Sequence, residues 1–190
     1  ERIGPDGAVL KTLSERQAAE LATRVAESGV SSAAVALMHS WRNNCHEQLL
    51  AKALEARGLR YLSLSSELCA LAGFLPRAVT TVVNAALSPV VRSYVEGVQS
   101  ATGYGSLKVM TSAGGLVTAE TFQPKDSLLS GPAGGVVGAA LSASRVGCER
   151  IIAFDMGGTS TDVSRFDRDL SYVFEQDRKS TRLNSSHVSQ

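Results

Sequence analysis

The chain has 190 residues and a formal net charge of +1; 44% of its residues are hydrophobic and 5% are aromatic. This composition is typical of a globular α/β protein of one domain or one and a half, and the near-neutral charge disfavours electrostatic binding to nucleic acid. The sequence shows neither a signal peptide nor an apolar run of the roughly 20 residues that a membrane helix needs, so we expect no membrane span.

The first third of the chain alternates between predicted strands and helices. The expected elements are a turn at 4–7 between short strands, a helix over 14–29, a strand over 33–38, a helix over 44–58 and a strand over 59–64. Ser14 and Gln17 have the spacing of a capping box, and Gly29 and Gly58 are typical helix ends. The resulting β-α-β-α-β order indicates a layered α/β domain.

In the middle of the chain, the sequence pattern predicts two further helices with a short strand between them. Residues 74–101 carry a helical apolar stripe, which Pro89 either kinks or divides into two helices. A strand follows at 107–110, and a helix begins near Pro132 and runs to Ser144. The small residues on one face of that helix favour close packing against another helix; anion binding at its start, near Ser130, is the alternative.

The most informative segment is 151–164. Its first four residues, Ile151 to Phe154, are all apolar and predict a strand buried on both faces, followed by a tight turn and a second strand. Acidic, glycine and hydroxyl residues gather around the turn: Asp155, Gly157, Gly158, Thr159, Ser160, Thr161 and Asp162.

These residue types suit phosphate. Glycines allow positive φ and a close approach of the main chain, successive N–H groups form a nest for anions, and hydroxyls donate further hydrogen bonds. Asp155 at the strand end is suited to Mg²⁺ or its water shell, since Mg²⁺ prefers carboxylate and phosphate oxygens. The alternative is an ordinary hairpin with two solvated aspartates, which does not account for the whole combination.

The segment resembles the phosphate-binding hairpin of the sugar kinase/Hsp70/actin superfamily, and it is most similar to that of the hydantoinase A/5-oxoprolinase family. Other segments occur in that family's order and approximate spacing: 37–40, 46–47, 63–67, 81–85 and 130–138. The resemblance covers nearly everything from residue 1 to about 175. Residues 64–67 and 75–77 are more similar to the 5-oxoprolinase branch of the family than to the hydantoinase branch.

This resemblance implies an actin-like (ribonuclease H-like) layered lobe followed by the start of a second lobe. Residues 1–147 would be the C-terminal part of the first lobe, including a hinge helix at about 132–145. Residues 148–176 would be the first β-hairpin of the second lobe. Residues 177–190 are polar and aperiodic and are predicted to be a non-native or disordered tail. We therefore expect an internal fragment of a longer enzyme.

The resemblance also implies a function: ATP-dependent opening of 5-oxoproline or a hydantoin through phosphorylation of the amide oxygen. Gly157, Gly158, Thr159, Ser160, Thr161 and Asp162 would bind ATP, and Asp155 would be catalytic and hold Mg²⁺ through water. The expected partners are a small cyclic amide and a second copy or a hydantoinase B-like subunit or domain, with neither nucleic acid nor membrane. The alternatives are an acetone-carboxylase-like subunit, another small-molecule kinase lobe, or a scaffold without chemistry of its own.

Other polar residues give weaker signals. His39 and His46 could act as acid/base groups, but fixing a loop is the more frequent role. Glu67 fits either substrate contact or the first turn of a helix. Arg77 could bind a carboxylate or lie exposed. Cys45, Cys69 and Cys148 are odd in number and widely spaced, which predicts buried thiols in a reducing, cytoplasmic compartment and disfavours both a disulfide framework and a metal centre.

Overall fold

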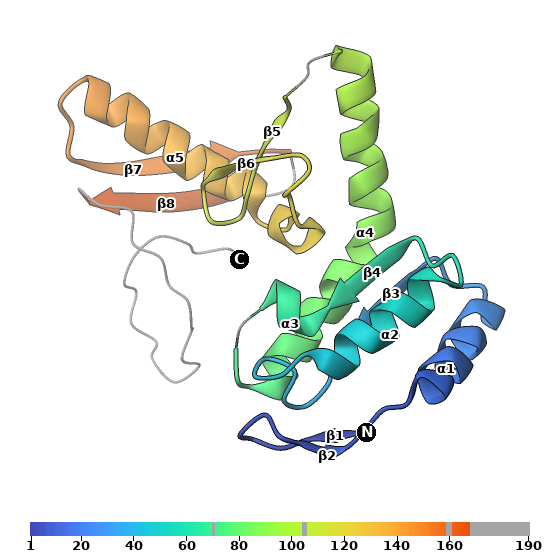
Figure 1. Cartoon of the computed structure of the whole chain (residues 1–190). Helices are drawn as coiled ribbons and strands as arrows, with labels where there is room; N and C mark the ends of the chain where they lie inside the picture. The colour runs from blue at the N-terminus through green and yellow to red at the C-terminus, as the bar shows by residue number, and fades with distance from the viewer. Residues whose placement is uncertain (70, 104–105, 159–160, 168–190) are drawn as a thin grey trace. The chain divides into compact units, whose positions relative to one another are not determined.

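The computed structural model describes residues 1–69, 71–103, 106–158 and 161–167, and these form two compact units. Unit 1 contains the described residues of 1–104 together with 123–125; unit 2 contains those of 105–122 and from 126 onward. Figure 1 labels the helices and strands of both units. The predicted lobe boundary near Gly147 falls inside unit 2, and the assignment of lobes stays a prediction.

Unit 1 shows the predicted alternation of strands and helices. Its elements are β1 (Arg2–Ile3), β2 (Val9–Lys11), α1 (Glu15–Glu27), β3 (Ser32–Val35), α2 (Cys45–Glu55), β4 (Tyr61–Leu64), α3 (Ser65–Leu68) and α4 (Phe74–Thr102). The predicted capping box starts α1: Ser14 Oγ accepts a hydrogen bond from the Gln17 N–H at 3.3 Å, and Gln17 Oε1 accepts one from the Ser14 N–H at 3.1 Å. The N-terminal donors of α1 thereby gain side-chain partners.

The two parallel strands of unit 1, β3 and β4, have helices on both faces (Figure 1). Successive side chains of a strand alternate between faces. Val35 and Leu64, which pair at the carboxyl end, therefore face α1 and α2, whereas Ser63 faces α4 and accepts a hydrogen bond from Asn84 at 2.9 Å. A layered α/β unit is thus confirmed, because parallel strands are stable only when both faces are covered.

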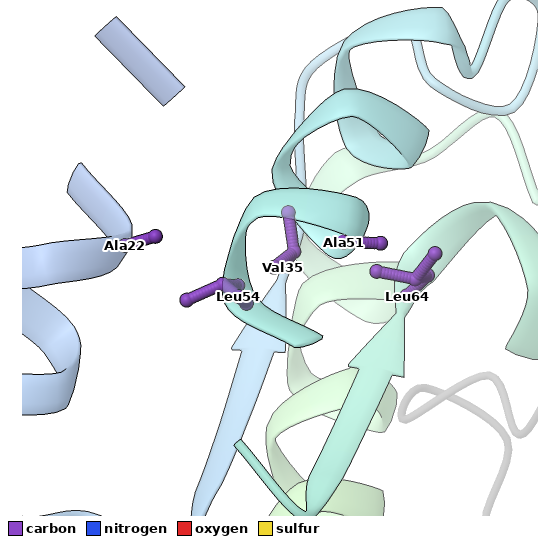
Figure 2. Packing of buried hydrophobic residues seen from close by; sticks show 5 residues of the cluster. All are labelled: Ala22, Val35, Ala51, Leu54 and Leu64. Atoms are coloured by element: carbon purple, nitrogen blue, oxygen red, sulfur yellow. The ribbon is translucent and has the colours of Figure 1, made fainter. Parts of the chain in front are cut away.

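The hydrophobic core of unit 1 lies between α1, α2 and the β3–β4 pair, and Figure 2 shows its most buried residues. They are Ala22, Val35, Ala51, Leu54 and Leu64. The alanines let the helices approach closely, and the larger side chains fill the space between helix and strand. Truncating a buried leucine in such a cluster costs about 2–5 kcal/mol.

Helix α4 is continuous from Phe74 to Thr102 and contains Pro89, so of the two alternatives for Pro89 the single long helix is found and the division into two helices is not. Its length and composition alone would suit a membrane span. However, the face toward β3 and β4 carries buried polar side chains, among them Arg77, Thr81 and Asn84, which bind groups within unit 1. This face of α4 therefore packs within unit 1, although only 28% of the apolar window of the helix is buried.

The described residues of unit 2 form two hairpins and one α-helix. Its regular elements are β5 (Lys108–Met110), β6 (Leu116–Thr118), α5 (Ser130–Arg145), β7 (Arg150–Met156) and β8 (Thr161–Asp167), with the 3₁₀ turn η1 (Pro124–Ser127) leading from unit 1 into it. Gly114 in the β5–β6 turn has φ +76°, and a Cβ there would lie 3.0 Å from Val137 Cγ2 of α5. Both the backbone conformation and the close approach require glycine.

Candidate functional site

The β7–β8 hairpin places the two predicted aspartates directly opposite each other. The strands pair from Arg150 opposite Asp167 to Met156 opposite Thr161, with Asp155 opposite Asp162. Residues 157–160 connect the strands at the end where the aspartates lie. The predicted hairpin is confirmed, and its register brings two carboxylates from different strands to one place beside the turn.

The two faces of the hairpin differ. One face carries the aspartates and is covered by α5, whereas the other exposes Ile152 by 65%, Phe154 by 71% and Met156 by 79%. The expectation that β7 is buried on both faces is therefore wrong for the described residues. An apolar run specifies that a strand tends to be buried, but it does not supply the second covering layer.

Asp155 and Asp162 are paired across the strands, and no ion pair to either is found in the part of the chain that the structure describes. Among the described residues, the ion pairs of the hairpin strands involve Arg165 with Asp167, at 2.8 Å, and neither Asp155 nor Asp162. Like charges directly across two strands disfavour each other. A cation between them would convert this repulsion into attraction, so the pair is suited to a metal ion.

The donor set of this pair fits Mg²⁺ better than a metal that needs a full protein cage. No group of three or more His, Cys, Asp or Glu side chains gathers at a metal-binding distance in the part of the chain that the structure describes. Mg²⁺ usually keeps several waters and takes one or two carboxylates together with phosphate oxygens. Asp155 and Asp162 would be those carboxylates.

The turn itself is seen only in part. Gly157 and Gly158 are exposed, and no atom lies within 4 Å of the position that a Cβ of Gly158 would occupy. The backbone of Gly158 is not in the left-handed region, so the expected positive φ is not found there. Neither the backbone conformation nor the space around Gly158 therefore requires glycine there, and the turn is open to a ligand. Thr159 and Ser160 lie outside the described residues; Thr161 begins β8 and is exposed.

Helix α5 approaches the hairpin closely through its glycines. A Cβ on Gly135 would lie 3.8 Å from Asp155 Oδ2, and one on Gly134 would lie 3.6 Å from Met110 Cγ of β5. The close packing predicted for this small-residue face is therefore formed with strands of unit 2. Side-chain capping is absent at the start of α5, where Ser130 Oγ instead donates to the Ser127 carbonyl at 3.0 Å.

Unit 1 contains a second concentration of polar residues, centred on Arg77, which is fully buried. Its Nε donates to Ser65 Oγ, one amino group donates to the carbonyls of Leu71 and Ala72, and the other donates to those of Leu37 and Met38. These acceptors use all five guanidinium donors. Arg77 is therefore neither exposed nor available for a substrate carboxylate, and both sequence expectations for it are wrong.

Glu47 is the anionic counterpart of Arg77 and is also fully buried. Its carboxylate accepts hydrogen bonds from the Leu37 N–H at 2.9 Å, Ser65 Oγ at 2.7 Å and the Ser66 N–H at 2.9 Å. Burial alone raises the pKa of this carboxyl, but the hydrogen bonds outweigh it and hold the pKa below its usual value. Ser65 thus links the anion to the cation.

No role was predicted for Glu47, although its position in the sequence indicates that it is buried. Ala51 and Leu54 follow it at helical spacing and are buried, so Glu47 lies in the apolar stripe of α2. A charged residue in such a stripe needs partners inside the protein. The sequence could not identify those partners, because Leu37, Ser65 and Ser66 come from other elements.

The remaining candidates have structural or exposed positions. The prediction that the cysteines are buried is wrong, because Cys45 and Cys148 are exposed and Cys69 is half-buried. His46 is buried; the Leu13 N–H donates to its Nε2 at 3.1 Å, and its Nδ1 lies 2.7 Å from Glu1 Oε2. This geometry supports the loop-fixing interpretation. Glu67 is exposed and accepts a hydrogen bond from Gln48 at 2.9 Å. A cavity of about 330 Å³ between β2 and α1, lined by Leu13, Leu21 and charged side chains, contains none of the predicted site residues.

Comparisons with known proteins agree with one another. The family model "Hydantoinase/oxoprolinase" matches residues 77–189, more than half of the chain, and "Hydantoinase/oxoprolinase N-terminal region" matches residues 1–58. The first range continues through the segment for which the sequence predicts a non-native tail, and that interpretation stays a prediction.

Relatives and a solved structure extend this likeness. The 5-oxoprolinase of Saccharomyces cerevisiae is 40% identical over 153 residues, and 5-oxoprolinase 1 of Arabidopsis thaliana is 41% identical over 154 residues. Each match covers 78% of this chain but only 12% of the relative. The acetophenone carboxylase gamma subunit of Aromatoleum aromaticum is 26% identical and matches 86% of this chain and 24% of its own length. The crystal structure of the ATP-dependent caprolactamase from Pseudomonas jessenii matches 86% of this chain and 25% of its own, with a TM-score of 0.76 and 28% identity.

Proposed function

Since this chain belongs to the hydantoinase/oxoprolinase family, we propose that it is part of an enzyme that uses ATP to open a cyclic amide, either 5-oxoproline or a hydantoin. The similarity to 5-oxoprolinases over most of the chain supports this substrate class, and the similarity to a caprolactamase described as ATP-dependent supports the use of ATP. The chain spans about an eighth of the oxoprolinases it matches, so the activity belongs to the longer protein.

The observation that carries the proposal is the position of Asp155 opposite Asp162 beside the exposed glycine turn. The turn's N–H groups and the hydroxyl of Thr161 would bind ATP phosphates, together with Thr159 and Ser160 of the same motif. Asp155 would act as the catalytic carboxylate and, with Asp162, would hold Mg²⁺. When bound, Mg²⁺ neutralises charge on the phosphates.

The chemistry proposed for the longer protein is transfer of the γ-phosphoryl group of ATP to the amide oxygen of the substrate. The carbon–oxygen unit then becomes an imidate phosphate, and water attacks its carbon more readily than that of the amide. What the residues of this chain supply is position and charge: the turn holds the phosphates, and Asp155 orients the metal or its water.

The finer structural and cellular expectations belong to the same proposal. In it, the chain has an actin-like fold, α5 is the hinge helix, and β7–β8 opens the second lobe of a cytoplasmic enzyme. The enzyme acts as an oligomer or with a hydantoinase B-like subunit or domain. The relationship to a carboxylase gamma subunit supports a multi-subunit arrangement. It also supports the second candidate, an acetone-carboxylase-like subunit that phosphorylates a non-lactam substrate.

The proposal is tested with the full-length protein, purified together with any subunit that copurifies. We expect release of ADP that depends on 5-oxoproline or a hydantoin, with the open-chain product detected by mass spectrometry. Turnover with acetone or acetophenone and bicarbonate, but not with lactams, would favour the carboxylase-like candidate. Binding of ATP without any turnover would favour a scaffold. The 190-residue chain alone is expected not to hydrolyse ATP, because it contributes one phosphate hairpin of the two that the superfamily uses.

A further inference from the structure

Gly135 occupies a distinct position among the glycines of α5. Its missing side chain points toward the site, with the ideal Cβ position 3.8 Å from Asp155 Oδ2. By contrast, no atom lies within 4 Å of the corresponding positions at Gly131 and Gly138, and Gly134 faces Met110. Gly135 is exposed, as is Gly138 one turn later on the same helix. The contact with Asp155 therefore distinguishes these two otherwise similar glycines.

We propose that Gly135 is a positioning residue for Asp155: it keeps free the space beside the carboxylate that a hydrated metal ion and ATP need. The inference rests on the proposed function of the hairpin and adds a residue of α5 to it. Asp155 is exposed, with Asp162 opposite it across the strands and the bare backbone of Gly135 beside its carboxylate.

The chemistry of Mg²⁺ explains why this space matters. Mg²⁺ gives up its waters reluctantly, so a carboxylate that binds it through water needs room for those waters around its oxygens. A methyl group at 135 would lie in van der Waals contact with Oδ2 and would exclude water from that side. A branched side chain would extend further and overlap the observed position of the carboxylate.

Helix stability gives no other reason for glycine at this position. Glycine in a helix interior is less stable than alanine because it loses more conformational freedom on folding. The Cβ of an alanine at 135 would meet no atom closer than 3.8 Å. The fold therefore tolerates alanine, and the exclusion of a side chain is explained by what must bind beside Asp155.

The test compares Gly135→Ala and Gly135→Val with the matched variants Gly138→Ala and Gly138→Val in the full-length protein. Mn²⁺ replaces Mg²⁺ as the probe, and electron paramagnetic resonance measures free Mn²⁺ in the presence of ATP, which gives a binding constant without any turnover. Thermal unfolding of each variant checks the fold. Both alanine variants are expected to remain folded, since each improves helix propensity.

We expect Gly135→Val to weaken Mn²⁺ binding by roughly 10- to 100-fold, the range typical for residues that support a metal ligand. Gly135→Ala should weaken it several-fold, and both Gly138 variants should bind as the unchanged protein does. If folded Gly135→Ala binds Mn²⁺ as tightly as the Gly138→Ala control, the inference is wrong, even if Gly135→Val fails to fold. If Asp155→Asn weakens binding but the Gly135 variants do not, only the role of Gly135 fails. If the unchanged protein does not bind Mn²⁺ with ATP, the proposed function fails as well.

Discussion

Charged residues are used in opposite ways in the two units. In unit 1, Arg77 and Glu47 are completely buried, and each is surrounded by hydrogen-bond partners of the opposite polarity. In unit 2, Asp155 and Asp162 stand opposite each other beside an exposed turn, without an opposing cation among the described residues. A charge whose bonding capacity is filled by the protein stabilises structure, whereas a charge left open to solvent remains available to a ligand.

The contrast also distinguishes residues needed for folding from residues placed for chemistry, which a sequence motif does not separate. Segments 37–40, 46–47 and 63–67 also occur in the family's order, yet in the structure their hydrogen bonds connect the segment after β3 with α2, α3 and α4. Resemblance to a family therefore marks residues that the protein needs, and burial with bonding distinguishes those needed for folding from those placed for chemistry.

The largest effect on stability is expected for Arg77→Ala. The substitution removes the Arg77 donors from the carbonyls of Met38, Leu71 and Ala72, and it removes the cation that Ser65 links to Glu47. We expect a loss of about 3–5 kcal/mol in the free energy of unfolding, measured by urea titration of the chain. Arg16→Ala is the control, because Arg16 is 85% exposed and its ion pair with Glu20 should be worth about 1 kcal/mol or less. Equal losses in the two variants would contradict the structural role of Arg77.

The largest effect on activity is expected for Asp155→Asn in the full-length protein. Asparagine keeps the size of the side chain but removes the charge that would hold Mg²⁺. Turnover should fall by about two orders of magnitude or more, the scale of losing one preorganised electrostatic contact. The melting temperature should change little, because no opposing cation accompanies the carboxylate among the described residues. Near-complete turnover at saturating Mg²⁺ would make Asp155 structural and remove the contrast between the units.

A smaller effect, dependent on pH, is expected for Glu47→Gln. The folded-state pKa of Glu47 lies below the usual 4.5, so its ionised form stabilises the fold above that pH, and this stabilisation is lost as the pH falls through the lower folded-state pKa. At pH 7 the variant should be less stable by about 1–3 kcal/mol, because an amide leaves one of the donors unsatisfied. Its stability should also fall less between pH 6 and pH 3 than that of the unchanged chain. Parallel pH profiles in urea titrations would show that Glu47 does not carry this dependence.

The smallest effect is expected for deletion of residues 177–190. If this segment is a tail that packs against nothing, as the sequence predicts, the melting temperature of the chain should stay the same within error. Calorimetry of the full and shortened chains measures this directly. A clear decrease would mean that the segment contributes to folding, in agreement with a family match that extends to residue 189.

Local patterns in the sequence were sufficient for most elements and for part of the site. The capping box at Ser14, the order of helices and strands in unit 1, and the β7–β8 hairpin were all predicted and confirmed. For Pro89 the sequence left two alternatives, and the structure shows the single long helix: a proline disfavours a helix interior, but tertiary packing of α4 outweighs that cost. The burial of β7 was misjudged, because an apolar run does not say whether a second layer is present.

The sequence by itself determined the element types, the position of Asp155 at a strand end and the resemblance to a family, because these depend on neighbours within a few residues or on order along the chain. Only the tertiary structure decided that Asp155 lies opposite Asp162 and beside Gly135. It also decided that the guanidinium of Arg77 donates its hydrogen bonds to backbone carbonyls and is not available to a substrate. The register of two strands, the distance from a helix to a strand and the partners of a buried charge each depend on residues from different elements. The packing of the whole unit determines these properties, and a local sequence pattern does not predict them.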